Sequence, residues 1–355
     1  MDHQHLEYVI SLHNALPREG NLPWSPYSVA SALGLAATGA RGRTRDELAA
    51  ALAGGGKLDV LARLLSDSVR LSAAEAAVAN TLWTRIGLNV REEFRQAVLG
   101  WPGGAVRAAD FEHDAEGSRQ KINNDVEQET RGLVKELLPP GAVHDETGTV
   151  IVNALYLRVA WQNPFEEGRT LPAPFHAPSG TRDVPIMRQQ EQFRYAAVDG
   201  WQMVTLPTPS DVVVDVLLPD GPDVTPPPPA TVAALRAESR SRKIDLALPR
   251  FRVEATLQLI EPLKTVGIEA AFEPAQADFG GISVSPMFIE SVAHKAILRA
   301  NEQGFEGAAA TALSFRLTSI DMSRPVPFYV DRPFLVLVRH TRTGAIYFLA
   351  RVIEP

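Results

Sequence analysis

The stretch Asn301-Glu-Gln-Gly-Phe-Glu-Gly-Ala-Ala-Ala-Thr-Ala-Leu-Ser-Phe-Arg-Leu-Thr-Ser-Ile-Asp-Met-Ser-Arg-Pro325 decides how the rest of the chain is interpreted. Alternate positions from Phe305 to Leu317 are small or apolar, and the positions between them become polar toward Thr318. This two-residue period is typical of a half-buried strand. The first half is mostly glycine and alanine, however, which neither fill a core nor stabilise a strand. Two interpretations are open: a surface loop between strands, or a segment that is a loop in one state and a strand in another.

Length and composition allow one large domain or two ordinary ones, because 355 residues with 45% hydrophobic content can build a sizeable core. The formal charge is −7 and no basic run occurs, so we expect no nucleic-acid partner. The chain has no cysteine, which excludes disulfides and thiol nucleophiles. Abundant proline and arginine, together with the lack of cysteine, fit a heat-resistant protein.

No apolar run approaches the roughly 20 residues of a membrane-spanning helix, so we expect no membrane partner. The opening Met-Asp-His-Gln-His has neither the basic start nor the apolar core of a secretory leader. The compartment stays open between the cytoplasm and a secreted form whose leader has been removed.

Helical patterns dominate the first part of the chain. Leu6–Leu16 has the spacing of an amphipathic helix, and 115–131 predicts a second one near the surface. Ser25 is placed to cap the N-terminus of an apolar, and therefore buried, helix. Thr44, followed three residues later by Glu47, has the pattern of a capping box that opens another helix.

Strand patterns dominate the second part. The β-branched and aromatic run 149–161 predicts a central strand, and 172–218 predicts a β-meander. The run 73–83 is a strand or a buried helix, since its periodicity does not decide. Two apolar runs around Thr343-Gly344 predict a buried hairpin. The predicted class is α+β with largely antiparallel sheets, and no linker divides the single domain 1–355.

The motifs of common enzymes are missing: the sequence contains no phosphate-binding loop, nucleophile elbow or His-Glu-x-x-His. His294 lies among apolar residues, which is more typical of a hydrogen-bonded core histidine than of a catalyst. His3, His5 and His13 are a weak metal cluster, because we expect the first two to fray with the terminus. We therefore expect no metal, no cofactor and no enzymatic activity, with a hydrolase that uses His294 and a serine as a minor alternative.

Seven segments, in order over essentially the full length from Leu6, resemble the serpins. They are Trp24-Ser-Pro-Tyr-Ser-Val-Ala-Ser-Ala-Leu33, Ile122-Asn-Asn-Asp-Val-Glu-Gln-Glu-Thr-Arg-Gly132, Val152-Asn-Ala-Leu-Tyr-Leu-Arg-Val-Ala-Trp-Gln-Asn-Pro-Phe165, Leu248-Pro-Arg-Phe-Arg-Val-Glu254, His294-Lys-Ala296, Asn301-Glu-Gln-Gly304 and Val330-Asp-Arg-Pro-Phe334. The chain looks like a prokaryotic member of this family of serine protease inhibitors. The resemblance implies three β-sheets with a large central one, about nine helices, an exposed reactive loop and a metastable monomer.

The resemblance also implies that 301–325 is the hinge and reactive loop. A serine protease would attack the loop and form an acyl-enzyme, after which the cleaved loop would insert into the main sheet as a new strand. About fourteen residues at roughly 3.3 Å each would carry the bound protease on the order of 45 Å. The implied scissile bond is Thr318–Ser319, which suits an elastase-like protease, with Leu317–Thr318 and a chymotrypsin-like protease as the neighbouring possibility. The implied hinge residues are Glu302, Gly304, Phe305, Glu306, Gly307, Ala308, Ala309, Ala310 and Thr311.

Family resemblance further implies a polar cluster where the central strands part, with Trp161 near the point of first insertion. The members of the cluster are Ser25, Ser28, Asn153 and His294. Phe305 departs from the family pattern, in which a small residue or threonine follows the glycine. A bulky residue that must be buried on insertion would slow that step. Phe305 therefore supports the alternative of a non-inhibitory serpin that acts as a binding, carrier or chaperone protein.

Overall fold

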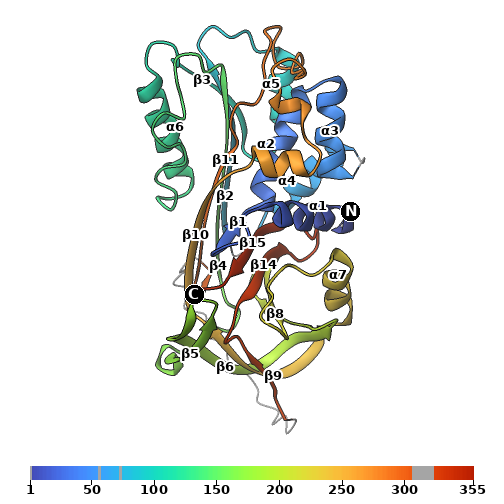
Figure 1. Ribbon diagram of the computed structural model, residues 1–355, viewed down its shortest axis with the longest axis vertical. Coiled ribbons are helices and arrows are strands. Elements are labelled where there is room, and N and C mark those ends of the chain that lie inside the picture. The colour runs from blue at the N-terminus through green and yellow to red at the C-terminus, as the bar shows by residue number, and fades with distance from the viewer. Residues whose placement is uncertain (1, 55–56, 72–73, 306–323) are drawn as a thin grey trace.

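The computed structural model describes residues 2–54, 57–71, 74–305 and 324–355. Most helices gather toward one end of an elongated molecule and many strands toward the other, while the strands of one sheet run along its length (Figure 1). The described residues form eight α-helices and two sheets. None of these helices is long and apolar enough to cross a membrane.

The central sheet has six strands and carries the segment on which the sequence analysis depends. From one edge to the other it consists of β10 (Phe251–Gln258), β11 (Ala293–Ala300), β12 (Gly304–Phe305), β4 (Thr149–Ala160), β2 (Glu75–Arg85) and β3 (Gly104–Ala109). All neighbours are antiparallel except β2 and β3. The prediction of a central strand over 149–161 is confirmed by β4, and the undecided run 73–83 is strand β2.

The second sheet has nine strands and contains the predicted meander and the predicted hairpin. Its order is β1 (Leu22–Trp24), β15 (Ile346–Val352), β14 (Phe334–His340), β8 (Val212–Pro219), β7 (Trp201–Pro207), β6 (Gly180–Val198), β9 (Arg240–Pro249) and β13 (Val326–Tyr329), with β5 (Leu171–Ala177) paired to β6. Only β13 and β9 are parallel within it. The α+β class with largely antiparallel sheets is therefore confirmed.

The count of three sheets is wrong for the described residues, and strand β6 is the reason. This strand is 19 residues long and pairs with β9 from Ile186 to Tyr195 and with β7 from Arg194 to Val198. One continuous strand thus hydrogen-bonds to both groups of strands, so groups that would otherwise form two sheets form one.

The count of nine helices is likewise wrong for the described residues. The eight α-helices are α1 (Asp2–Ala15), α2 (Pro26–Gly39), α3 (Gly42–Ala53), α4 (Leu58–Ser68), α5 (Glu92–Val98), α6 (Ala115–Glu129), α7 (Pro229–Glu238) and α8 (Ile260–Thr265). Two further turns, Glu167–Arg169 and Ala270–Phe272, are short 3-10 helices. A single turn of this kind has too little hydrogen bonding to stand as a helix of its own.

The predicted start of a helix after Ser25 is confirmed, whereas the helix start predicted at Thr44 is wrong. The Ser25 hydroxyl accepts the N–H of Ser28 at 3.0 Å and caps α2. Helix α3 instead begins at Gly42 without a side-chain cap. The Thr44 hydroxyl accepts the N–H of Asp278 at 3.0 Å, and the Glu47 carboxylate accepts two N–H groups of the Glu269–Ala270 turn at 2.8 and 2.7 Å. The residues of the expected capping box therefore hold a distant segment against α3.

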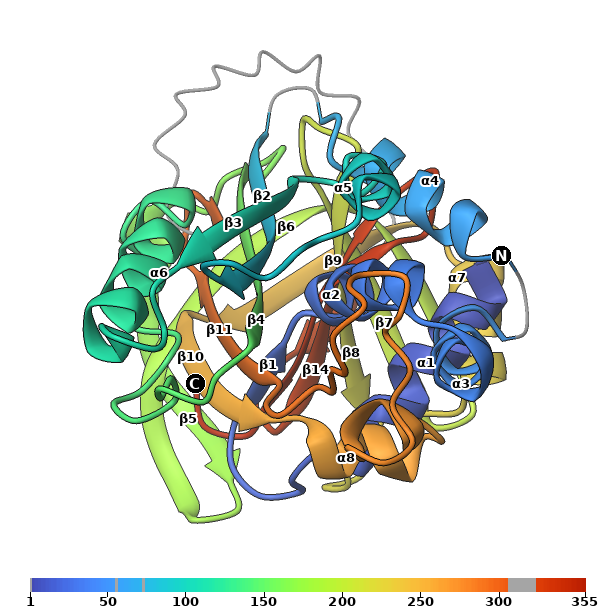
Figure 2. The same ribbon diagram turned by 90° about the horizontal axis from the view of Figure 1, so that it is seen from above.

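The central sheet lies between helices on its two faces (Figure 1). Helix α6 covers one face, where Ile122 and Val126 form a cluster with Trp83 of β2 and Val152 of β4. Helix α2 lies on the other face (Figures 1 and 2) and is buried along almost its whole length. The strands β4 and β11 are thus enclosed from both sides.

The N-terminal helix is anchored rather than frayed at His5. This side chain is buried, and its ring nitrogen Nε2 accepts the N–H of Ile346 at 3.2 Å. The reason we gave for discounting the histidine cluster is therefore wrong for His5. Among the described residues, no group of three or more histidine, aspartate or glutamate side chains is arranged to hold a metal ion.

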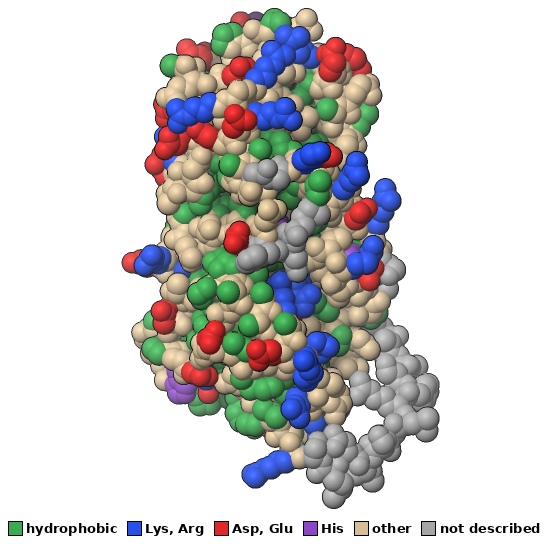
Figure 3. All heavy atoms as spheres, turned by 90° about the vertical axis from the view of Figure 1, so that its right-hand side faces the viewer, with side chains coloured by type: hydrophobic (Ala, Val, Ile, Leu, Met, Phe, Trp, Pro, Cys, Tyr) green, Lys and Arg blue, Asp and Glu red, His purple; other side chains and the backbone are tan. Residues whose placement is uncertain are grey.

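The face to the right in Figure 1 carries charges of both signs. Figure 3 shows lysine and arginine side chains interspersed with aspartate and glutamate over this face. Alternating signs keep the local potential low and favour solubility.

Candidate functional site

The central sheet is incomplete between β11 and β4. Strand β12, which separates them, consists of two residues: Phe305 pairs with Ala300 of β11 and Val159 of β4, and Gly304 pairs with Ala160. Within the described ranges, no other residue pairs with the facing edges of β4 and β11, and these two strands do not pair with each other. Among the described residues, the strand position between β4 and β11 is therefore filled only at one end.

Phe305 already lies inside this sheet. Its side chain is 2% exposed and meets two aromatic rings edge-on: Trp161 at 6.3 Å and Phe251 at 6.5 Å between centroids. Aromatic pairs in this geometry add to the free energy gained by burial. The expectation that Phe305 would first be buried during insertion is wrong in this structure, because its burial precedes any cleavage.

Gly304 is required by the close approach of β12 to β4. A Cβ atom at this position would lie 2.3 Å from the carbonyl oxygen of Val159, a contact that backbone atoms cannot relieve by rotation. The Asn301 side chain accepts the N–H groups of Gln303 and Gly304 at 3.0 and 3.1 Å, and these bonds close the turn that brings the chain into the sheet.

A buried carboxylate holds the segment before the turn. Glu302 is 2% exposed and accepts hydrogen bonds from Arg250 at 2.5 Å and from Thr170 at 2.6 Å. Burial alone would raise the pKa of Glu302, but the bonds from Arg250 and Thr170 lower it below its ordinary value. Sequence reasoning assigned no role to Arg250, although it lies inside the segment Leu248–Glu254 quoted for the resemblance.

Trp161, the residue directly after β4, contacts the same turn. Its indole N–H donates to the carbonyl of Asn301 at 2.7 Å, and its backbone N–H donates to the carbonyl of Gln303 at 3.0 Å. The structure therefore places Trp161 beside the hinge, as expected. It does not bring Trp161 to the other four predicted residues, because Asn153 lies eight positions earlier in β4, which corresponds to roughly 26 Å along an extended strand.

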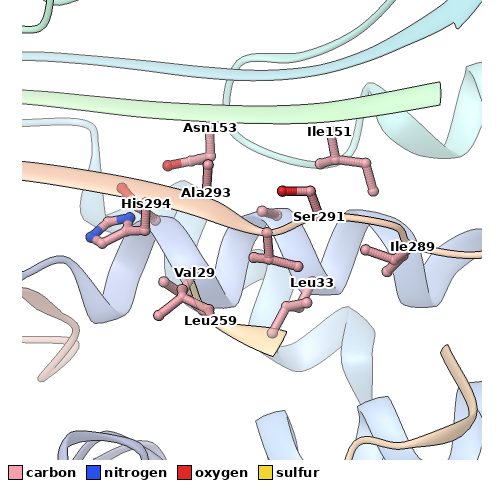
Figure 4. Close-up of a pocket in the computed structure, with 12 residues that line it drawn as sticks. Val29, Leu33, Ile151, Asn153, Leu259, Ile289, Ser291, Ala293 and His294 are labelled. Atoms are coloured by element: carbon pink, nitrogen blue, oxygen red, sulfur yellow. The ribbon is translucent and has the colours of Figure 1, made fainter. Parts of the chain in front are cut away.

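The remaining four predicted residues, Ser25, Ser28, Asn153 and His294, line one cavity between α2, β4 and β11. Figure 4 shows Asn153 and His294 of this group. The backbone N–H of Ser25 donates to Nε2 of His294 at 3.0 Å, and the Ser25 hydroxyl donates to the carbonyl of Tyr347 at 2.7 Å. Burial lowers the pKa of His294 to about 4, so its ring is neutral at neutral pH. The Ser25 hydroxyl is thus not paired with the ring, and the pair lacks the arrangement of nucleophile and base that the hydrolase alternative requires.

Asn80 is a further member of this cluster that sequence reasoning missed. The side-chain amide of Asn153 donates to Oδ1 of Asn80, and the Asn80 amide donates to the carbonyl of Pro102 at 2.6 Å. Asn80 lies in β2, in a run whose alternation gave no indication of a polar partner. Only the pairing of Asn80 with Asn153 across β2 and β4 brings the two amides together.

Two small cavities follow the open strand position. The first, of about 30 Å³, lies between β4 and the start of β11 above α2, with Asn153 and His294 on its walls (Figure 4). The second continues between Ala154–Leu155 of β4 and Lys295–Ile297 of β11. The Oδ1 atom of Asn153 is buried without a hydrogen-bond partner. Well-packed sheets leave few such spaces, so these cavities show that the two strands are parted here.

The loop itself falls outside the described residues. This holds for the predicted hinge residues Glu306, Gly307, Ala308, Ala309, Ala310 and Thr311, for the predicted scissile bond Thr318–Ser319, and for its alternative Leu317–Thr318. Their roles remain predictions.

Comparison with known proteins gives one family. Residues 7–355 match the family model described as Serpin (serine protease inhibitor). Serpin-Z2B of Oryza sativa subsp. japonica is 33% identical, over 94% of this chain and 91% of the relative. The human leukocyte elastase inhibitor is 30% identical, over 95% and 93%, and an uncharacterized serpin-like protein of Thermococcus kodakarensis is 30% identical, over 94% and 81%. Relatives from a plant, a mammal and an archaeon do not support the narrower resemblance to prokaryotic members.

Solved structures have the same fold as this chain over nearly their full length. Native protease nexin-1 with heparin has a TM-score of 0.85 and 26% identity, over 100% of this chain and 99% of the other. Human thyroxine-binding globulin complexed with thyroxine has a TM-score of 0.87 over 100% and 98%, and its 23% identity shows the fold alone.

Proposed function

Because this chain belongs to the serpin family, we propose that it is an irreversible suicide inhibitor of serine proteases with chymotrypsin-like or elastase-like specificity. The protease cleaves the reactive loop within 301–325, and the acyl-enzyme is trapped when the cleaved loop inserts into the central sheet. The inhibitor acts as a monomer of one domain, 1–355, and is consumed without turnover.

The open strand position between β4 and β11 is the observation that carries this proposal. Each of these strands presents an edge to which no described strand pairs beyond Phe305 and Ala300. A strand that entered here would satisfy backbone groups on both edges and would continue β12 without a change of direction. The stabilisation gained by completing the sheet supports insertion after cleavage as the step that displaces the protease.

The small residues after Phe305 suit such an insertion. Alternation from buried Phe305 assigns Gly307, Ala309 and Thr311 to the same face of an extended strand. Small side chains enter a preformed sheet with little steric resistance, so the hinge sequence supports fast insertion. The polar cluster around His294 would be the region in which β4 and β11 separate to admit the strand.

The proposed scissile bond is Thr318–Ser319. A small residue on its N-terminal side suits the narrow specificity pocket of an elastase-like protease, whereas cleavage after Leu317 suits a chymotrypsin-like one. The relative named leukocyte elastase inhibitor supports the first of these classes.

Incubation with pancreatic elastase and with chymotrypsin tests the proposal. We expect a covalent complex that survives denaturing electrophoresis. We also expect a released C-terminal fragment whose mass corresponds to a chain that begins at Ser319 or at Thr318. Quantitative cleavage without a complex would refute inhibition of these proteases.

A non-inhibitory serpin that binds or carries a ligand is the second candidate. The support for it is Phe305, which stands where the family pattern has a small residue or threonine. The two candidates differ in the response to loop cleavage by a non-target protease. Insertion completes the sheet and raises the unfolding temperature, whereas a chain that does not insert unfolds at the same temperature as before.

A further inference from the structure

A cavity of about 510 Å³ opens where α1 ends beside the end of β15. It is walled by the last turn of α1 and the loop after it, the turn between β5 and β6, the loop between β8 and α7, and the end of β15. Its volume is in the range of sites for small organic molecules. No residue that lines it also lines the cavities between β4 and β11, so it is separate from the proposed inhibitory machinery.

His13, which lines this cavity, carries a buried hydrogen-bond donor. The indole N–H of Trp24 donates to Nδ1 of His13 at 2.9 Å. An indole can only donate, so Nδ1 is the acceptor and the proton of the neutral ring lies on Nε2. That Nε2 atom is buried and has no hydrogen-bond partner, although the His13 side chain is only 2% exposed. A buried donor without an acceptor is unusual enough to require an explanation.

A buried cation lies next to it. Arg351 is 6% exposed, and its four hydrogen bonds run from Nε and Nη2 to the backbone carbonyls of Pro17, Glu19 and Gly20, at 2.8 to 3.3 Å. These bonds use no N–H group of Nη1, and no carboxylate of the described residues forms an ion pair with Arg351. The guanidinium therefore keeps its positive charge and two donors available to the cavity.

The surroundings of His13 keep its ring neutral. Burial, and then the charge of Arg351, lowers the pKa of His13 to about 3, so the ring remains a neutral donor. The carboxylate of Asp223, which also lines the cavity, accepts the N–H of Thr225 at 2.8 Å. Its pKa is lowered chiefly by this bond and, less, by Arg18. Glu19 contributes an exposed side chain at the rim. Neither carboxylate neutralises Arg351.

The rest of the lining has an apolar part beside the polar side chains of Asn14, Arg18 and Thr225. The apolar part includes Pro178, Pro222, Val224, Pro226 and Ile353. Arg18, a second cation of the lining, acts on Asp223. An apolar wall beside the N–H donors of His13 and Arg351 fits a molecule with an apolar body and one anionic head.

We propose that this cavity binds a small apolar monocarboxylate, whose oxygens accept from Nε2 of His13 and Nη1 of Arg351. This activity is independent of protease inhibition. A carboxylate suits the site better than a neutral carbonyl, because charge-assisted hydrogen bonds are roughly twice as strong as neutral ones.

Calorimetric titration with 3-phenylpropionate and octanoate, each compared with its primary amide, tests the proposal. Acid and amide have the same apolar body, so the comparison isolates the charged head. We expect each acid to bind at least tenfold more tightly than its amide. Equal affinities for acid and amide, or no binding of either acid at millimolar concentration, would overturn the proposal.

Substitutions test whether the acids bind in this cavity. Val224→Trp fills the cavity and should weaken binding of both acids at least tenfold, whereas Val284→Trp, at a position that is 75% exposed and outside the cavity, should leave it unchanged. Arg351→Gln should remove the preference for acid over amide. If Arg351→Gln does not fold, Val224→Trp still decides, since unchanged binding by that variant would place the ligand elsewhere.

Discussion

Phe305 meets Trp161 edge-on, with 6.3 Å between ring centroids and an angle of 82° between ring planes. This contact joins the first residue after Gly304 to the end of β4, and it makes the hinge part of the folded core. The free energy of the native state therefore depends on a residue that the family pattern suggested would only be buried later.

Phe305→Ala should destabilise the native protein rather than accelerate its inhibition. Loss of a buried phenylalanine costs about 3–5 kcal/mol, which denaturant unfolding measures as a lower midpoint. Phe288→Ala is the matched control, because Phe288 is 37% exposed and should change the midpoint little. An unchanged midpoint together with fewer inhibitor molecules consumed per protease would mean that Phe305 acts by slowing insertion.

Arg250→Met should weaken the anchor of the hinge. The variant leaves the Glu302 carboxylate buried without its charged donor, a loss of about 1.5–3 kcal/mol for a hydrogen bond to a charged group. Arg252→Met is the control two residues away: its pair with Glu254 is about half exposed on both sides and should contribute less than about 1 kcal/mol. Equal effects of the two substitutions on the unfolding midpoint would contradict the role given to Arg250.

His294 should make the protein less stable in acid. Its pKa is about 4 in the folded state, against an ordinary value of 6.5, so the unfolded chain binds more protons between these values. Stability should therefore fall as pH drops from 6.5 toward 4, by up to about 1.4 kcal/mol per pH unit. His294→Gln can still accept the N–H of Ser25 but cannot titrate, and it should remove this part of the slope.

Unfolding midpoints of the native sequence and of His294→Gln, measured from pH 4 to 7, give the difference in slope between the two proteins. His176→Gln serves as the control, since His176 is exposed and its ring shares a hydrogen bond with the Thr181 hydroxyl. A slope that stays the same in His294→Gln would show that other groups cause the acid sensitivity.

Ala309→Arg should convert the inhibitor into a substrate. Alternation from buried Phe305 puts position 309 on the inner face of an inserted strand, where a guanidinium would be buried without a partner. Ala308→Arg puts the same charge on the opposite face and should retain more covalent complex. Gel electrophoresis of both variants with elastase compares the two, and equal trapping would refute this assignment of faces.

The helices and strands could largely be predicted from the sequence, because their signals are local. The run 149–161 is apolar and β-branched along its length, and it forms β4; Ser25 followed by proline caps α2. Thr44 and Glu47 show the limit of this reasoning. Their spacing is that of a capping box, but contacts with Asp278 and with the Glu269–Ala270 turn compete for the same side chains, and no local pattern reveals partners more than 200 residues away.

The candidate site, like the fold, could be predicted from the sequence only in part. The resemblance of the quoted segments to the serpins implied that Ser25, Ser28, Asn153 and His294 form one cluster and that Trp161 lies near the hinge. In the structure these four residues line one cavity, and the Trp161 indole donates to the carbonyl of Asn301. Asn80 and Arg250 could not be expected, since each matters only through a side chain from another strand or from the hinge.

The sequence by itself determined the alternation of small and apolar residues after Gly304, because side-chain period is a local property of the chain. Only the tertiary structure decided that Phe305 is buried and that no other described residue pairs between β4 and β11. Both depend on the separation of β4 and β11, whose facing residues lie more than 130 positions apart in the chain and meet only through β12.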